Sequence, residues 1–283
     1  MNPTDAETVA AGVLRLPLRT PTLPPATCTN TLLVWGTRLV IIEPATPHAD
    51  EQERLVGEVE RLAAAGVRPY AIVLTHHHGD HVGFAAPLRE RLGGAVPILA
   101  HPETAARLSF AIDRPLDDGD TLTLGDGVEL RAVFTPGHAP GHLVLLETRS
   151  RVAYVGDMLA GEGTILIDPY DGGDMAAYLD SLRRIDALGA VALVPAHGPV
   201  LRAPGEAIAA YVAHRRAREA AVLSAITGEP RPLAAVLAAS YADTPQWLWP
   251  LAERSLEAHL RKLVAERLVE RDGENVWRLR DVD

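Results

Sequence analysis

The 283-residue chain has very little cysteine and lysine and no long hydrophobic run. Cys28 is its single cysteine, which excludes an intramolecular disulfide framework and fits a reducing compartment. Arginine carries nearly all of the positive charge, because Lys262 is the single lysine. No apolar run reaches the length of about eighteen residues that a membrane helix needs, and the first residues lack the charged-then-apolar pattern of a secretory signal. We therefore expect a cytoplasmic protein without a membrane partner.

An excess of positive charge is also missing. The net charge is −10, while 47% of the residues are hydrophobic, which is enough for a sizeable core. Residues 208–283 hold eleven basic and eleven acidic side chains, so residues 1–207 carry the whole excess, with 26 acidic against 16 basic groups. Binding of long nucleic acid depends on a basic surface. The balance favours a small-molecule or carrier-bound acyl substrate as partner, and nucleic acid is the less favoured alternative.

What the sequence does contain is a dense group of metal-type ligands. Residues 75–81 read Thr-His-His-His-Gly-Asp-His, directly after the apolar residues 71–74. Imidazole nitrogen and carboxylate oxygen are ligands of zinc, manganese and ferrous iron. In extended backbone, His76 and His78 point to one side and His77 to the other. We therefore predict that His76 and His78 bind metal and that His77 does not.

Three further residues of this kind each follow a strand-like run. His138 follows residues 128–134, Asp157 follows residues 152–156, and His197 follows residues 190–194. The ends of such runs are where loops gather into a cleft. We expect these residues to join the histidine loop in one site.

Strand-like and helix-like segments alternate through the first 207 residues, which predicts an α/β class. Residues 30–35 and 38–42 read as a β-hairpin, and helices are expected near residues 50–65, 85–92 and 174–188. Residues 1–27, rich in proline and threonine, are expected to run along the surface.

The rest of the chain has a different pattern. Helical segments at 207–226, 232–240 and 255–268 precede two short strands around Asp272-Gly273. Three helices and a hairpin suggest a winged helix. We therefore divide the chain into a catalytic domain, residues 1–207, and a winged-helix-like domain, residues 208–283.

On these motifs the chain resembles the metallo-β-lactamase superfamily over nearly its whole length. The motif H-x-H-x-D-H of that family matches His76, His78, Asp80 and His81. Its later ligands match His138, Asp157 and His197. The resemblance implies a four-layer αββα sandwich and two divalent metal ions, zinc first, with manganese or iron as alternatives.

The resemblance also implies how the ligands divide. One ion would be held by His76, His78 and His138, and the other by Asp80, His81 and His197. Asp157 would bridge the two ions, and Asp80 would act both as a ligand and as a proton shuttle.

A narrower match is to the lactamase-β-2-like group, beside glyoxalase II and the lactonases. It rests on Gly-Glu-Gly-Thr at 161–164, Tyr-Leu-Asp-Ser-Leu at 178–182, and Tyr211-x-x-His214-Arg215-x-x-Arg218-Glu219. The sequence departs from the superfamily in two places: Glu43-Pro44-Ala45 replaces Asp-Thr-Gly, and Ala196 precedes His197 where glycine is usual.

Four residues are candidates for a supporting role. Glu43 is expected to act as a carboxylate that supports the metal ligands, and His142 as a structural neighbour of the site. Glu162 and Tyr170, in the loop after Asp157, are candidates for the lining of the substrate pocket, with an ordinary surface loop as the alternative.

The resemblance implies hydrolysis by a metal-bridging hydroxide, because divalent ions lower the pKa of bound water to about 7. We favour an acyl thioester or a related ester as substrate. The alternative is an endoribonuclease that cleaves single-stranded RNA, an activity seen in the lactamase-β-2-like group. A lesser alternative is a nucleic-acid-binding module with a metal-sensing domain. Class B lactamase activity fits poorly, because those enzymes commonly have cysteine where Asp157 stands.

Overall fold

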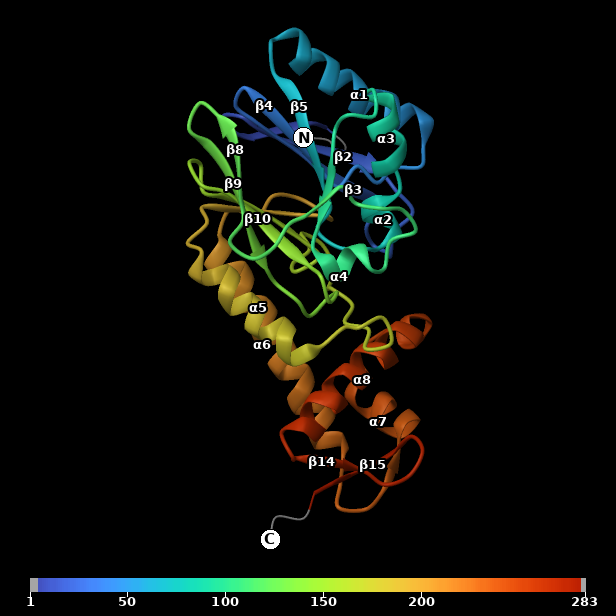
Figure 1. Ribbon diagram of the computed structural model, residues 1–283. Coiled ribbons are helices and arrows are strands. Elements are labelled where there is room, and N and C mark those ends of the chain that lie inside the picture. Colours follow the sequence, from blue (N-terminus) through green and yellow to red (C-terminus); the bar gives the residue numbers. More distant parts are fainter. Residues whose placement is uncertain (1–4, 281–283) are drawn as a thin grey trace.

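The computed structural model describes residues 5–280, and two facing sheets form the centre of its N-terminal part (Figure 1). The first sheet has seven strands, which lie side by side in chain order. They are β1 (Glu7–Ala10), β2 (Val13–Arg19), β3 (Cys28–Trp35), β4 (Arg38–Ile42), β5 (Arg68–Val73), β6 (Ile98–Ala100) and β7 (Arg114–Pro115). The pairs from β1 to β4 are antiparallel, whereas those from β4 to β7 are parallel.

The second sheet has five strands in the order β12-β11-β10-β9-β8. They are β8 (Thr121–Gly125), β9 (Val128–Phe134), β10 (Leu143–Glu147), β11 (Val152–Gly156) and β12 (Ala192–Pro195). Only β11 and β12 pair in parallel, with α5 (Met175–Ala187) as the crossover between them.

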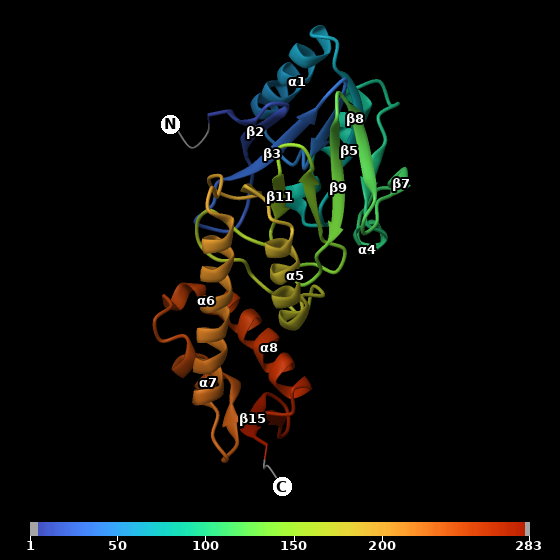
Figure 2. The ribbon, with the colours of Figure 1, turned by 90° about the vertical axis from the view of Figure 1, so that its left-hand side faces the viewer.

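The two sheets pack face to face, and helices cover both outer faces (Figure 2). Apolar side chains of both sheets, such as Val34 and Leu145, form the central core. Helices α1 (Ala49–Ala64) and α3 (Ala85–Arg91) pack on the first sheet. Helix α5 and the start of α6 (Pro204–Ala225) pack on the second. The expected αββα sandwich is therefore confirmed.

Three short helices complete the described elements: α2 (Gly79–Val82), α4 (Pro102–Ala105) and the 3-10 helix η1 (Gln246–Leu248). No helix within residues 5–280 is long and apolar enough to cross a membrane.

The expectation that residues 1–27 run along the surface was wrong for β2. Strand β2 lies inside the first sheet, with Leu16 and Leu18 buried under α1. Pro17 is tolerated because β1 pairs only with residues 13–15, so β2 is an edge strand at that point and needs no N–H there. Residues 1–4 lie outside the described part.

The C-terminal part has the winged-helix elements that the sequence predicted. Helices α7 (Leu233–Ser240) and α8 (Trp249–Ala265) pack with the end of α6 around a separate core that includes Leu256. A three-stranded sheet of β13 (Arg231–Pro232), β15 (Val276–Leu279) and β14 (Val269–Arg271) closes it. Helix α8 begins at Trp249 rather than near residue 255, with a proline in its first turn.

Helix α6 joins the two parts as one continuous helix of 22 residues. Ile208 near its start belongs to the core under the second sheet, and Val222 near its end belongs to the winged-helix core. The division proposed at residues 207 and 208 therefore falls within a single rigid element.

Candidate metal centre

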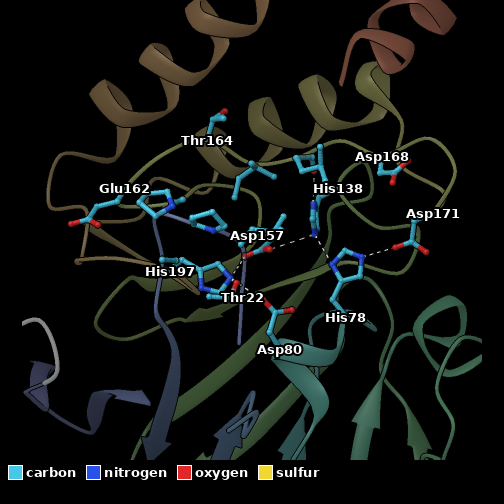
Figure 3. A pocket seen from close by; sticks show the side chains of 17 residues that line it. Thr22, His78, Asp80, His138, Asp157, Glu162, Thr164, Asp168, Asp171 and His197 are labelled. Atoms are coloured by element: carbon cyan, nitrogen blue, oxygen red, sulfur yellow. Dashed lines mark hydrogen bonds and ion pairs between the residues drawn. The ribbon is translucent and has the colours of Figure 1, made fainter. Parts of the chain in front are cut away.

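Seven side chains of the ligand type meet at one end of the sandwich. Figure 3 shows five of them, His78, Asp80, His138, Asp157 and His197. The seven side chains come from four loops, each following a strand: β5, β9, β11 and β12. The ligand-type atoms of His76, His78, His138 and Asp157 lie within 4.8 Å of one another, and so do those of Asp80, His81 and His197. The structure thus brings together every ligand candidate that the sequence predicted, in two groups.

In the first group, three imidazole nitrogens converge. His78 Nδ1 lies 3.0 Å from His76 Nε2 and 3.0 Å from His138 Nε2. Each of these rings turns its other nitrogen outward to a different partner. A convergent set of three histidine nitrogens is a typical arrangement for a divalent transition metal.

Asp157 lies between the two groups. Its Oδ2 is 3.5 Å from His138 Nε2 and 3.5 Å from His81 Nε2, while Oδ1 is 3.4 Å from His197 Nε2. Asp80 completes the second group, with carboxylate oxygens 3.6 Å from both His81 Nε2 and His197 Nε2. The Asp157 carboxylate therefore faces both groups at once.

Two buried polar atoms at this point indicate that the residues fit a metal pair. His81 Nε2 and Asp157 Oδ1 are inaccessible to solvent and have no hydrogen-bond partner within the described chain. Leaving such atoms without a partner costs about 1–3 kcal/mol each. Both atoms point into the space between the ligand groups, where metal coordination would satisfy them.

Glu43 supports one histidine from each group. His81 Nδ1 donates to Glu43 Oε2 at 2.8 Å. Thr75 Oγ1 donates to Glu43 Oε1 and accepts from His76 Nδ1 at 2.9 Å. These bonds use the Nδ1 atoms of both rings, so that Nε2 of His76 and of His81 faces the centre. The carboxylate also accepts from Tyr154 Oη at 2.5 Å.

Two more histidines are fixed by backbone carbonyls. His138 Nδ1 donates to Leu166 O at 2.8 Å, and His197 Nδ1 donates to Cys28 O at 2.9 Å. In each ring the outer N–H is thereby assigned and Nε2 is left as an acceptor.

His78 is held differently, by a residue that the sequence reasoning missed. Its Nε2 donates to Asp171 Oδ2 at 2.6 Å, and His77 Nε2 lies 3.2 Å from the same carboxylate. Asp171 stands in a polar turn after Asp157, and no spacing rule links it to the histidine loop. The His77 side chain thus points toward this turn and away from the space between the two ligand groups.

His142 is a buried neighbour of the ligands. Its Nε2 accepts the backbone N–H of Asp157 at 3.2 Å, and its Nδ1 lies 2.9 Å from Thr135 Oγ1. Gly156 allows this close approach, because a Cβ at that position would stand 2.5 Å from His142 Nε2.

The pKa values differ within the cluster. Burial lowers the pKa of His76 and His142 well below 6.5, and lowers that of His138 to about 4, so these rings are neutral near pH 7. Burial acts on His81 in the same direction, but the carboxylates of Glu43, Asp157 and Asp80 prevail and raise its pKa well above 6.5. Burial would raise the pKa of Asp157, but His81 and His197 hold it well below its usual range.

A pocket of about 280 Å³ opens onto the two groups (Figure 3). Its walls are residues 22–26 and the loop from residue 160 to residue 171. Glu162 lines this pocket, as expected. Tyr170 is not among the lining residues; 61% of it is exposed, and its ring lies beside Arg254 and Arg261 of α8.

Comparisons with known proteins agree with this architecture. The model of the metallo-beta-lactamase superfamily matches residues 25–197, and that of the beta-lactamase associated winged helix domain matches residues 233–277. The Beta-lactamase-like protein 2 homolog of Caenorhabditis elegans is 29% identical over 250 residues, which is 86% of this chain and 80% of that protein.

Solved structures share the fold. A beta-lactamase domain protein from Burkholderia ambifaria has a TM-score of 0.84 at 21% identity, over 98% of this chain and 94% of that one. Another protein, solved in a di-iron-bound form, has a TM-score of 0.51 at 30% identity, over 66% of this chain and 92% of that one. The chain described here belongs to the metallo-β-lactamase superfamily, whose fold implies divalent metal ions, and it carries the associated winged helix domain.

Proposed function

We propose that this protein is a binuclear metal-dependent hydrolase that cleaves acyl thioesters or related esters. The observation that carries the proposal is the character of the pocket at the ligand groups. Within residues 5–280, its lining contains no arginine or lysine, whereas Glu162, Asp168 and Asp171 add negative charge. An uncharged acyl group can enter such a pocket, but a chain of phosphates would be repelled.

His76, His78 and His138 would hold one ion, and Asp80, His81 and His197 the other, with Asp157 shared. Divalent ions there would supply Lewis acidity and a water of lowered pKa. Zinc is proposed because imidazole and carboxylate donors suit it, and the same donors accept iron or manganese. The di-iron form of the similar structure makes iron the first alternative to test.

Asp80 would carry out both proton transfers that the reaction needs. Asp80 lines the pocket, and its carboxylate would accept the proton that the attacking water loses. As the carbon–sulfur bond breaks, Asp80 would return that proton to the leaving thiolate. Ile165, Leu166 and Leu23 give the pocket apolar wall for the acyl chain.

The position of α8 also supports a small substrate over a nucleic-acid-reading role. A winged helix reads DNA with a helix laid in the major groove. Helix α8, the last helix before the hairpin, buries Leu256 and Leu260 in the winged-helix core and places Ala258 in the core under the second sheet. The sides of α8 that carry Leu256, Leu260 and Ala258 are therefore covered within the chain.

The proposal is tested by kcat/KM for an acyl thioester and for single-stranded RNA, each at two ionic strengths with one metal-loaded preparation. We expect the thioester to be the better substrate and its kcat/KM to vary little with moderate salt. Efficient RNA cleavage that falls steeply with salt, beside negligible thioester hydrolysis, would favour the endoribonuclease instead.

A further inference from the structure

We propose that Asp171 is a positioning residue for the first metal site, and that the C-terminal domain sets its position through the turn of residues 168–171. This inference rests on the proposed function, because it takes His78 as a metal ligand. It assigns the winged helix domain a role in the chemistry that does not involve nucleic acid.

The first step is the contact between His78 and Asp171. The outer nitrogens of the other histidines in the cluster bond to the buried groups of Glu43 and Thr75 and to two half-buried backbone carbonyls. The outer nitrogen of His78 bonds to a carboxylate that is 48% exposed. The orientation of this one ligand therefore depends on a surface turn.

The second step is the rigidity of the turn itself. Asp168 O accepts from the backbone N–H groups of Asp171 at 3.1 Å and Gly173 at 2.7 Å, and Asp168 Oδ1 accepts from Tyr170 N at 2.9 Å. A Cβ on Gly173 would come within 2.7 Å of Asp168 O. Because these hydrogen bonds join Asp168, Tyr170 and Asp171, a displacement of Tyr170 or Asp168 would also displace Asp171.

Two arginines of α8 contact the turn of residues 168–171. Arg261 Nη1 donates to Pro169 O at 3.1 Å, and Arg254 Nη1 lies 3.7 Å from Asp168 Oδ1. The guanidinium carbon of Arg254 lies 4.5 Å from the centre of the Tyr170 ring, and that of Arg261 lies 5.2 Å from it. Cation–π contact and these polar contacts together hold the turn against the winged helix domain.

Helix α6 holds the preceding part of the same loop. Tyr211 Oη accepts from Ala160 N at 2.8 Å, and Arg215 donates to Ile165 O. Both residues belong to the Tyr-x-x-His-Arg motif, which has no role in the proposed chemistry. Its first and fifth residues therefore anchor the wall of the pocket, beside the turn that α8 anchors.

The consequence for the metal follows from the tautomer of His78. A carboxylate that accepts from Nε2–H keeps the Nδ1 lone pair on the metal side and makes it more basic. Loss of such a partner typically weakens metal binding by about 10–100-fold. Asp171 should thus affect the ion at His78 much more than the ion at His197.

A double-mutant cycle tests the two parts of the inference. The variants are Asp171→Asn, the α8 pair Arg254→Ala with Arg261→Ala, and their combination, with Asp186→Asn and Arg216→Ala as exposed controls. The readouts are the two stepwise dissociation constants for Zn²⁺, measured against a chelating dye, and the absorption spectrum of the Co²⁺-loaded protein. Thermal unfolding of the metal-free proteins checks that each variant folds.

We expect Asp171→Asn to weaken one of the two ions about tenfold, with a changed Co²⁺ spectrum, while the controls match the wild type. The α8 pair should weaken the same ion, and the combination should bind no more weakly than Asp171→Asn alone. Wild-type affinity for both ions in Asp171→Asn would overturn the role of Asp171. Fully additive losses in the combination would overturn the coupling through α8. A wild-type protein that binds neither ion would instead overturn the proposed function itself.

Discussion

Gly156 shows how tightly single residues are constrained around the ligands. Its φ is +49°, and a Cβ would stand 2.5 Å from His142 Nε2 and 2.9 Å from Thr75 Oγ1. Gly156→Ala should therefore destabilise the protein by about 1–3 kcal/mol, as overpacked sites do, and should lower its metal content. Thermal unfolding and elemental analysis measure the two effects. Gly57→Ala is the control: it lies in α1 with nothing within 4 Å, and should stabilise by about 0.5–1 kcal/mol. Equal behaviour of the two variants would contradict the packing described here.

His81 predicts a pH dependence of metal binding. Because Glu43, Asp157 and Asp80 raise its pKa well above 6.5, the metal-free protein holds a proton on this ring at pH 7. An ion at the second site must displace that proton, so affinity should rise as pH increases toward the pKa of the metal-free protein. Calorimetric titration with Zn²⁺ in buffers of different ionisation enthalpy should show release of about one proton from His81. Proton uptake, or none exchanged, would contradict this assignment.

At the scale of single residues, the sequence was sufficient to place the ligand candidates. Each follows a strand that ends at the same end of the sandwich, so His138, Asp157 and His197 of the second sheet meet the histidine loop of the first. Asp171 could not be found in this way. It reaches His78 from 93 positions away, and its turn is held by α8 at a further separation of 92. Such contacts depend on how the turn packs against the histidine loop and α8, which no local pattern records.

Among the elements, α6 has the largest consequence for the rest of the fold. Ending the chain after residue 203 would remove it, expose the apolar face of α5 and release the pocket wall that Tyr211 and Arg215 hold. We expect a lower soluble yield and a lower Tm than for the full chain, and not a clean loss of nucleic-acid binding alone. The comparison is soluble yield, Tm and ester hydrolysis of both forms. A truncated form that hydrolyses a small ester normally but no longer binds RNA would identify the tail as a recognition module.

The errors of sequence reasoning at this scale have a physical cause. Residues 1–27 were expected at the surface because prolines are frequent there, yet β2 is buried on both faces. The sheet accommodates Pro17 because β1 ends before it, which is a property of the neighbouring strand. The hairpin of β3 and β4 was predicted correctly, since its two-residue connection is a local signal.

For the whole molecule, charge and architecture point the same way. The acidic excess lies in residues 1–207, where the pocket opens, and residues 208–283 are balanced. The winged helix domain packs against α5 and the pocket loop through α8. The C-terminal helices thus hold the loop that lines the pocket, so the two parts of the chain depend on each other.

The proposed function requires that the seven ligand-type residues hold two divalent ions. The most direct test is elemental analysis of protein purified without chelator, with metal expressed per chain. We predict about two ions per chain, because the donors form two groups that share Asp157. A content well below one ion per chain in a preparation that retains hydrolytic activity would contradict the account.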